Sequence, residues 1–500
     1  METHNVRVSK GRYVSNTACC IIIVKVLNNR KEQIMKFVIR ALLIHFVMVC
    51  LLSEYTQAQA DGFIWRQYAE PKLAGWSTEK LKEALDYAED LNSAAVMVVY
   101  KGKAVIAWGD LKTNFNCHSM RKAFLSALYG IYVDREIINI GKTLDKLRIN
   151  DVTPLTNTEK QATVEHLLQS RSGIYLPAMG DGSSMIANKP KRGSHKPGEY
   201  YHYNNWGFNA LGTIFEQETG KKIFDEFMIN ISEPLGMEDF SSKNMEMRTA
   251  DYTKHGYYSF RMSARDLARF GLLYQQNGIW NGKRIIPKDW IKKSTRSYSN
   301  TGQGGFGYMW KTFPKSESSK YGFDHLANFD VYATTGIAVH MLAIVPELDL
   351  VYVHRYDSDS SIPHYESLPV YKLLDLIIAA KTGEPVDDLK FIELTTMPLS
   401  NAPRPIKKPD AIKLSREVLD SYVGTYYLPP VTLRIARAGD HLQIIEADGS
   451  VFDNLYPETK HLFFYGVWDR KIEFVIDEKG NVTHYYLITK GVKEKATKIE

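Results

Sequence analysis

A serine and a lysine stand three residues apart at the head of an apolar stretch, in the segment HSMRKAFLSALYG (residues 118–130). Residues three apart share one face of a helix, so the amine of Lys122 can reach the hydroxyl of Ser119. To accept a proton near neutral pH a lysine must be uncharged, and burial lowers its pKa. Apolar residues follow Lys122 on nearly every side, which is typical of a helix inside the core. The sequence therefore predicts a nucleophile, Ser119, with Lys122 as its base.

The same spacing recurs at Ser77 and Lys80, so spacing alone does not identify the nucleophile. Ser77 precedes LKEALDYAED, whose interspersed charges indicate a surface helix, and we expect this serine to be an N-cap. A capping serine with a solvent-reaching lysine is also the alternative at Ser119. Cys117 is a further possible nucleophile beside Ser119. A free cysteine is more often simply buried, and that is the reading we favour.

Two Tyr-x-Asn motifs lie downstream, Tyr298 to Asn300 in the polar loop KKSTRSYSNTGQGG and Tyr203 to Asn205 in PGEYYHYNNWGFNALG. At this point the chain resembles the serine β-lactamase-related hydrolases, which include class C β-lactamases, DD-peptidases, certain esterases and 6-aminohexanoate-dimer hydrolase. That family pairs S-x-x-K with Y-x-N, and the context of the second motif matches it better. The resemblance implies that Tyr203 relays a proton beside Lys122, and that Asn205 orients Lys122 or the substrate. Whether Lys122 or Tyr203 takes the first proton stays open.

The family's third element is a K-T-G or related triplet on a strand. A literal Lys-Thr-Gly at 381–383 ends an apolar helix, so Gly383 indicates a C-cap and not a site. The strand equivalent is the run Thr334, Thr335 and Gly336. The resemblance implies that Gly336 lets substrate approach the backbone and that the N–H groups of Ile337 and Ser119 form an oxyanion hole.

Thr334 stands where the family usually has lysine. The missing cation weakens the expectation that the site grips a penicillin carboxylate, and favours an esterase or amide hydrolase acting on a small or peptide-like substrate. A true β-lactamase or DD-peptidase is one alternative, and a penicillin-binding or sensor protein without turnover is another. The sequence contains no H-E-x-x-H and no G-x-S-x-G, so we expect neither a metal or organic cofactor nor an α/β-hydrolase.

The elements around these motifs predict a mixed α/β (α+β) fold. Strands are expected near 94–110 and 331–355, a helical block near 155–300, and a final helix at 371–383. This order implies one antiparallel sheet flanked by helices, with an inserted helical subdomain, as in the β-lactamase and transpeptidase fold. We expect this hydrolase domain to span 61–396. A proline-rich linker at 397–410 and a small antiparallel β-sheet or barrel at 411–500 should follow.

The N-terminus resembles an export signal. A basic start at 35–40, the apolar run ALLIHFVMVCLL and Ala58-Gln59-Ala60 predict a signal peptide at 35–60, with cleavage near Ala60 and a secreted or periplasmic product. Residues 1–34 then look like a misassigned upstream extension, and a membrane anchor is the alternative for 35–60. Without residues 1–60 the chain has 55 basic and 54 acidic residues. This near-neutral balance argues against nucleic acid or anionic lipid as a partner, so contact with membrane is expected only through the cleaved signal.

Overall fold

The computed structural model describes residues 63–499, except 183–184, 187, 338, 360–367, 400–408, 429–430, 446–450, 467–469 and 490–491. The expected upstream extension (1–34) and signal peptide (35–60) lie outside the described residues, as does most of the expected linker. None of the helices described is long and apolar enough to cross a membrane.

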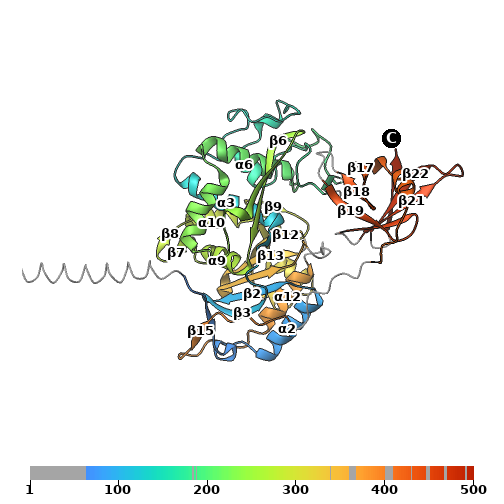
Figure 1. Cartoon of the computed structure of the whole chain (residues 1–500). Helices are drawn as coiled ribbons and strands as arrows, with labels where there is room; N and C mark the ends of the chain where they lie inside the picture. The colour runs from blue at the N-terminus through green and yellow to red at the C-terminus, as the bar shows by residue number, and fades with distance from the viewer. Residues whose placement is uncertain are drawn as a thin grey trace, which may run out of the picture. The chain divides into compact units, whose positions relative to one another are not determined.

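The larger domain is built on a sheet of ten described strands (Figure 1). Across the sheet they run β15 (Phe391–Glu393), β1 (Arg66–Tyr68), β3 (Lys103–Gly109), β2 (Ala95–Tyr100), β14 (Leu350–Arg355), β13 (His340–Val345), β12 (Val331–Gly336), β11 (Lys311–Phe313), β10 (Gly305–Phe306) and β9 (Ser299–Asn300). Neighbouring strands are antiparallel except β1 and β3, which are parallel. The two halves of the sheet meet where β2 pairs with β14, with Tyr100 opposite Leu350. This confirms the expected single sheet assembled from distant parts of the chain.

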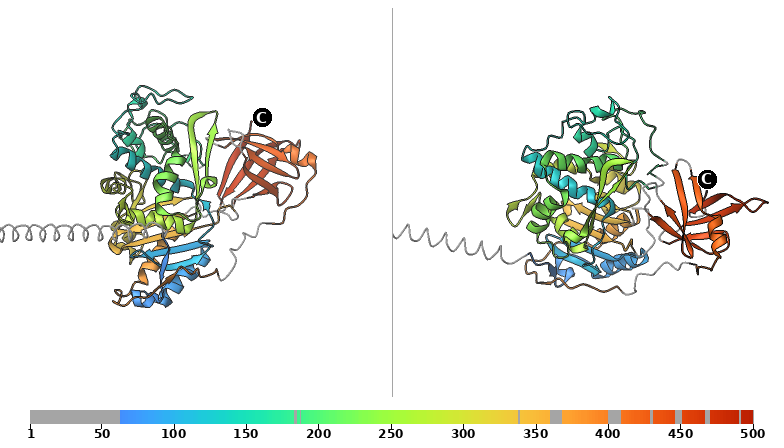
Figure 2. Two further views of the ribbon diagram at one scale, coloured as in Figure 1. Left: turned by 60° about the vertical axis from the view of Figure 1, so that its left-hand side comes forward. Right: turned by 45° about the horizontal axis from the view of Figure 1, so that its top comes forward.

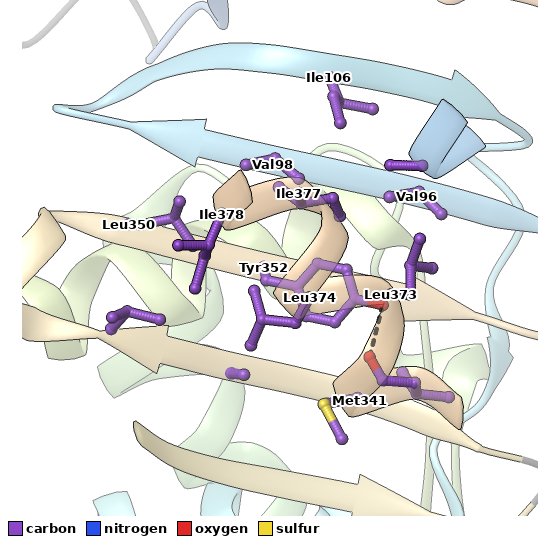
Figure 3. Packing of buried hydrophobic residues seen from close by; sticks show 14 of the residues in the cluster. Val96, Val98, Ile106, Met341, Leu350, Tyr352, Leu373, Leu374, Ile377 and Ile378 are labelled. Carbon is purple, nitrogen blue, oxygen red and sulfur yellow. Dashed lines mark hydrogen bonds between the residues drawn. The ribbon is translucent and has the colours of Figure 1, made fainter. Parts of the chain in front are cut away.

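Helices cover both faces of the sheet. On one face α2 (Thr78–Asp90) and α12 (Leu368–Ala379) pack against alternate side chains of the central strands, and Figure 3 shows Tyr352 of β14 among Leu374, Ile377 and Ile378 of α12. On the other face α9 (Ala264–Gln275) approaches so closely that a Cβ on Gly271 would lie 2.4 Å from Val351. Each large apolar side chain buried in this way contributes about 1.5–3 kcal/mol.

The helical block lies between the two halves of the sheet in sequence, and Figure 2 shows it from two further directions. Its helices are η2 (His118–Met120), α3 (Arg121–Asp134), η3 (Glu159–Gln161), α4 (Val164–Leu168), α6 (Asn205–Thr219), α7 (Ile223–Phe227), the π-helix η4 (Met228–Ser232) and α8 (Glu233–Leu235). Helix α3 is buried on nearly every side, as its apolar sequence predicts. At Gly130 it touches Trp290 of α10 (Lys288–Ser294), where an added Cβ would come within 2.4 Å of the indole.

Shorter elements complete this domain: η1 (Pro71–Ala74), η5 (Ser242–Asn244), a sheet of β4 (Phe115–Asn116), β6 (Thr253–Met262) and β5 (Met245–Ala250), the hairpin β7 (Ile279–Trp280) and β8 (Lys283–Arg284), α11 (Lys315–Lys320) and η6 (Leu326–Asn328). A short 3-10 helix, η7 (Pro346–Leu348), joins β13 to β14.

The C-terminal part is a separate closed barrel, which confirms the small antiparallel β-domain. After α13 (Arg416–Ser421) its strands are β16 (Gly424–Leu428), β17 (Val431–Ala438), β18 (His441–Ile445), β19 (Val451–Pro457), β20 (Leu462–Tyr465), β21 (Arg470–Ile476), β22 (Val482–Thr489) and β23 (Val492–Lys498). Alternate residues such as Leu442 and Ile444, or Ile472 and Phe474, point into its core. Its core is formed mainly by its own strands, with the period of two expected of a half-buried sheet, and Leu419 of α13 and Tyr422 pack into it.

Candidate active site

Ser119 and Lys122 form the centre of the site. Ser119 lies in the 3-10 turn η2 that leads into α3, and Lys122 occupies the first turn of α3. The side-chain nitrogen Nζ of Lys122 lies 2.9 Å from Oγ of Ser119, within hydrogen-bonding distance. The three-residue spacing therefore brings the two groups together as the sequence predicts.

The surroundings of Lys122 favour its neutral form. The side chain is only 3% exposed, and Nζ lies 4.9 and 5.0 Å from the ring centres of Tyr203 and Phe208. Burial lowers the pKa of Lys122 well below its ordinary range, and the positive charge of Arg121 lowers it further. An uncharged amine beside the hydroxyl can accept its proton.

The other Ser-x-x-Lys pair has none of these properties. Oγ of Ser77 accepts a hydrogen bond from the backbone N–H of Lys80 at 3.3 Å, so Ser77 caps α2 as expected. Lys80 is exposed, and its Nζ donates to the carbonyl of Ala379 at 3.3 Å. Ser77 is therefore a helix cap and not a nucleophile.

Tyr203 meets Ser119 and Lys122 from a distant part of the chain. It lies two residues before α6, and its hydroxyl forms a hydrogen bond with Ser119. Its ring packs on Phe208 with the ring centres 5.1 Å apart. Burial raises the pKa of Tyr203, although the hydrogen bond from Ser119 and the charge of Arg121 partly offset the rise. The phenol is therefore protonated at neutral pH and can donate a proton.

The literal Tyr-Ser-Asn motif is part of the sheet edge. Tyr298 stacks on Tyr308 with ring centres 5.0 Å apart, and Ser299 and Asn300 form β9. Arg171 holds this segment by donating to the carbonyl of Tyr298 at 3.0 Å. These contacts are structural, and they distinguish this motif from the one at Tyr203.

Asn205 binds a loop carbonyl. Its amide nitrogen donates to the carbonyl of Gly180 at 2.7 Å and lies 3.6 Å from the sulfur of Met185. Its buried Oδ1 has no hydrogen-bond partner among the described residues. The side-chain amide nitrogen of Asn205 is therefore not directed to Lys122, because it bonds to Gly180 in the loop before α6. Among the described residues, this Oδ1 oxygen is an unused hydrogen-bond acceptor.

The Thr-Thr-Gly triplet lies at the end of β12, where this strand approaches η2. A Cβ on Gly336 would come 2.7 Å from the carbonyl oxygen of Cys117 and 3.2 Å from Cβ of His118. Only glycine therefore allows β12 to lie this close to the residues before Ser119. Thr334 is buried and Ile337 is 40% exposed. The structure brings this triplet and the Ser119 turn together.

The literal Lys-Thr-Gly lies elsewhere. Helix α12 ends at Ala379, so Gly383 is not its C-cap, contrary to the sequence expectation. The chain instead continues past the helix and pairs with the N-terminal segment, where Thr382 N–H donates to the carbonyl of Gly75 at 2.8 Å. The amine of Lys381 contacts Glu384 at 3.1 Å. The triplet is structural, as expected, but it pairs with the N-terminal segment and does not cap the helix.

Arg121 is a functional candidate that the sequence reading missed. Its side chain is fully buried and its guanidinium lies 4.0 Å from the ring centres of both Tyr257 and Tyr258. One nitrogen donates to Oδ1 of Asn209 at 2.7 Å, while Nε and Nη1 have no hydrogen-bond partner among the described residues. Arg121 is thus a buried cation directly before Lys122 in the chain. Its position between Ser119 and Lys122 is the feature of the sequence that could have identified it.

A histidine and serine cluster supports the turn before Ser119. His118 has a φ of +45°, which is uncommon for a residue other than glycine. Its Nε2 lies 2.9 Å from Oγ of Ser358, and Nε2 of His340 lies 3.4 Å from the same hydroxyl. Burial lowers the pKa of His118 to about 4, so the ring is neutral at neutral pH. This cluster anchors the strained turn to the strands behind it.

Cys117 is buried, and burial raises the pKa of its thiol, so it is a packed side chain and not a thiolate nucleophile. Among the described residues no group of three or more His, Cys, Asp or Glu side chains is placed to hold a metal ion.

The sheet, the helical insertion and the pairing of a serine with a buried lysine define a serine hydrolase with the β-lactamase fold. The family described as Beta-lactamase matches residues 78–385. The chain therefore belongs to the β-lactamase family, whose members with this fold are serine hydrolases.

Several known proteins are similar to this chain. An uncharacterised protein of Alkalihalophilus pseudofirmus is 23% identical over 306 residues, which are 54% of this chain and 86% of that protein. The octameric penicillin-binding protein homologue from Pyrococcus abyssi is 18% identical, with a TM-score of 0.45, over 84% of this chain and 99% of that one. A class C β-lactamase is 14% identical, with a TM-score of 0.46, over 61% and 96%.

Proposed function

We propose that this protein hydrolyses an ester or amide through an acyl-enzyme on Ser119. The observation that carries the proposal is the 2.9 Å contact between Lys122 Nζ and Ser119 Oγ, made by an amine whose side chain is 3% exposed. A buried lysine beside a hydroxyl is the arrangement that nucleophilic catalysis requires. The fold of a serine hydrolase family supports the same conclusion.

The first step transfers the acyl group to the enzyme. Ser119 Oγ bonds to the carbonyl carbon, its proton passes to the neutral amine of Lys122, and the carbonyl electron pair moves onto oxygen. The carbon to leaving-group bond then breaks as that group takes a proton from the Lys122 ammonium through Tyr203. Lys122 is the first base on this proposal, because its pKa is lowered whereas that of Tyr203 is raised.

The second step releases the acid. A water molecule gives a proton to the amine of Lys122 and bonds to the acyl carbon, and Ser119 Oγ leaves with that proton. The backbone N–H groups of Ser119 and Ile337 hold the oxyanion in both steps. The close approach of Gly336 to Cys117 supports this role, since it brings the end of β12 beside the nucleophile. Such donors act on the charge that develops in the transition state.

Turnover of a substrate panel tests the proposal. Short-chain p-nitrophenyl esters, a chromogenic cephalosporin and a D-Ala-D-Ala peptide are each assayed with wild type and with Ser119→Ala. We expect ester hydrolysis at least 100-fold faster with wild type. Equal rates for the two proteins would contradict the proposal. Intact mass during turnover separates hydrolysis from trapping, because a stable adduct without product would indicate a binding or sensor protein instead.

A further inference from the structure

Lys311 lies beside the proposed catalytic groups and takes no part in the proposed reaction. It is the first residue of β11 and pairs with Ala333 of β12, directly before Thr334. On its other side it pairs with Phe306 of β10. The ring of Phe306 lies edge-on to Tyr203, with the ring centres 6.1 Å apart. Lys311 therefore lies between the Thr-Thr-Gly strand and the phenol.

Lys311 has no acidic partner in the part of the chain that the structure describes. Its side chain is partly buried, and none of the ion pairs among the described residues includes it. Burial alone lowers the pKa of Lys311 to about 8, with no contribution from a carboxylate. A partly buried cation without an acidic partner is unfavourable in a folded chain and is typical of functional sites.

This charge acts at the catalytic centre. Lys311 lowers the pKa of Lys122, as Arg121 does. Asp181 has the opposite effect on Lys122, but its carboxylate already pairs with Lys189 at 2.6 Å. The site therefore has an excess of positive charge. A positive field within a partly buried site attracts anionic ligands.

We propose that Lys311 binds an anionic group, a carboxylate, on the acyl portion of the substrate. The inference rests on the proposed acyl-enzyme function and names its substrate class. Thr334 leaves the strand of the Thr-Thr-Gly triplet without a cation, and the neighbouring strand supplies one. The substrates are then anionic acyl compounds. Lys311 can bind their carboxylate although position 334 is a threonine.

A pair of matched esters tests this assignment. p-Nitrophenyl hemiglutarate carries a free carboxylate, and its methyl-capped counterpart, p-nitrophenyl methyl glutarate, has nearly the same length without the charge. The measured quantity is the ratio of kcat/KM for the anionic ester to that for the neutral ester. A ratio cancels any common effect of Lys311 on the pKa of Lys122.

Four proteins are compared: wild type, Lys311→Met, Lys311→Arg and the control Lys315→Met. Lys315 lies on α11, the next element along the chain, and its 45% exposed side chain pairs with Glu347 at 3.1 Å. We expect wild type to prefer the anionic ester and Lys311→Met to lower the ratio at least 10-fold, mainly through KM. Lys311→Arg should keep most of the preference, and Lys315→Met should keep all of it.

A ratio that is the same in wild type and Lys311→Met would overturn the assignment, and so would an equal loss in Lys311→Met and Lys315→Met. In both cases ester hydrolysis that depends on Ser119 would leave the proposed function standing. A wild-type protein that hydrolyses neither ester would instead contradict the proposed function, and the inference built on it would fail with it.

Discussion

Gly336 of β12 faces the carbonyl of Cys117 so closely that an added Cβ would lie 2.7 Å from that oxygen. This distance is shorter than real Cβ contacts allow, and the neighbour is backbone, so it cannot rotate away. The end of β12 and the Ser119 turn can be adjacent only because residue 336 has no side chain.

Gly336→Ala should therefore separate β12 from the nucleophile. We expect kcat/KM to fall on the order of 100-fold, because a displaced strand weakens an oxyanion donor. The overpacked contact should also lower the free energy of unfolding by about 1–3 kcal/mol. Gly182→Ala is the matched control, since an added Cβ there meets nothing within 4 Å. Full activity in Gly336→Ala would contradict the proposed placement of the oxyanion hole.

Removing the charge of Arg121 should change the pH dependence of catalysis. Arg121 lowers the pKa of Lys122, so Arg121→Met should raise that pKa. The active form has neutral Lys122, which is present above its pKa and lost as pH falls. The acidic limb of kcat/KM against pH should therefore move to higher pH. Arg121→Lys should restore it, and Arg135→Met, at the end of the same helix, should leave it in place. An unmoved limb in Arg121→Met would refute this electrostatic role.

Lys122 should reduce stability while it supports catalysis. Its folded pKa lies below that of the unfolded chain, so the unfolded state binds more protons between the two values. Stability from this group accordingly rises with pH up to the unfolded pKa, near 10.4. Lys122→Met should raise Tm at pH 7 and abolish turnover, as expected where activity opposes stability. Lys82→Met, at an exposed salt bridge to Asp86, is the control. A lower Tm in Lys122→Met alone would show that the amine stabilises the fold.

His118 should make the fold sensitive to mild acid. Burial lowers its pKa to about 4, below the value near 6.5 of an unfolded histidine. Between these two pH values the unfolded state binds the proton first, so stability is lost as pH falls through this window. His118→Asn should flatten the dependence of Tm on pH between 6.5 and 4, since asparagine tolerates the left-handed backbone. Circular dichroism melts across this range measure the effect, and identical slopes in the two proteins would disprove it.

Processing at the N-terminus remains a proposal of its own. Export from the signal at 35–60 should yield a mature chain that begins at Asp61, and Edman sequencing of the secreted protein measures this directly. A chain that retains residues 35–60 and fractionates with membranes would instead indicate an uncleaved anchor. Translation from Met35 should suffice for export, because the expected signal begins there.

Much of the fold could be predicted from local patterns. The apolar run after Lys122 and the charged run after Ser77 correctly distinguish a buried helix from a surface helix. The spacing of apolar and charged residues along a helix indicates which of its faces are buried. The single sheet is predicted from two sets of strands on either side of a helical block. The barrel is predicted from short strands in which apolar and polar residues alternate. The parallel pairing of β1 with β3 could not be predicted, because it depends on where a three-residue strand docks.

The rest of the site depends on contacts between distant residues. Arg121 becomes a buried cation because Tyr257 and Tyr258, far along the chain, enclose it. Asn205 has the expected position, but the loop at Gly180 determines where its amide nitrogen points. Lys311 lies opposite Ala333, the residue before Thr334, only through the register of β11 and β12. Such neighbours leave no periodic signal in the sequence.

Covalent labelling with a fluorophosphonate tests the central claim most directly, with the modified residue located by peptide mass spectrometry. Wild type and Ser77→Ala should both acquire one label, on the peptide that carries Ser119, whereas Ser119→Ala should acquire none. Lys122→Met should label at least 100-fold more slowly. A label on Ser77, or undiminished labelling of Ser119→Ala, would contradict the assignment of Ser119 as the nucleophile.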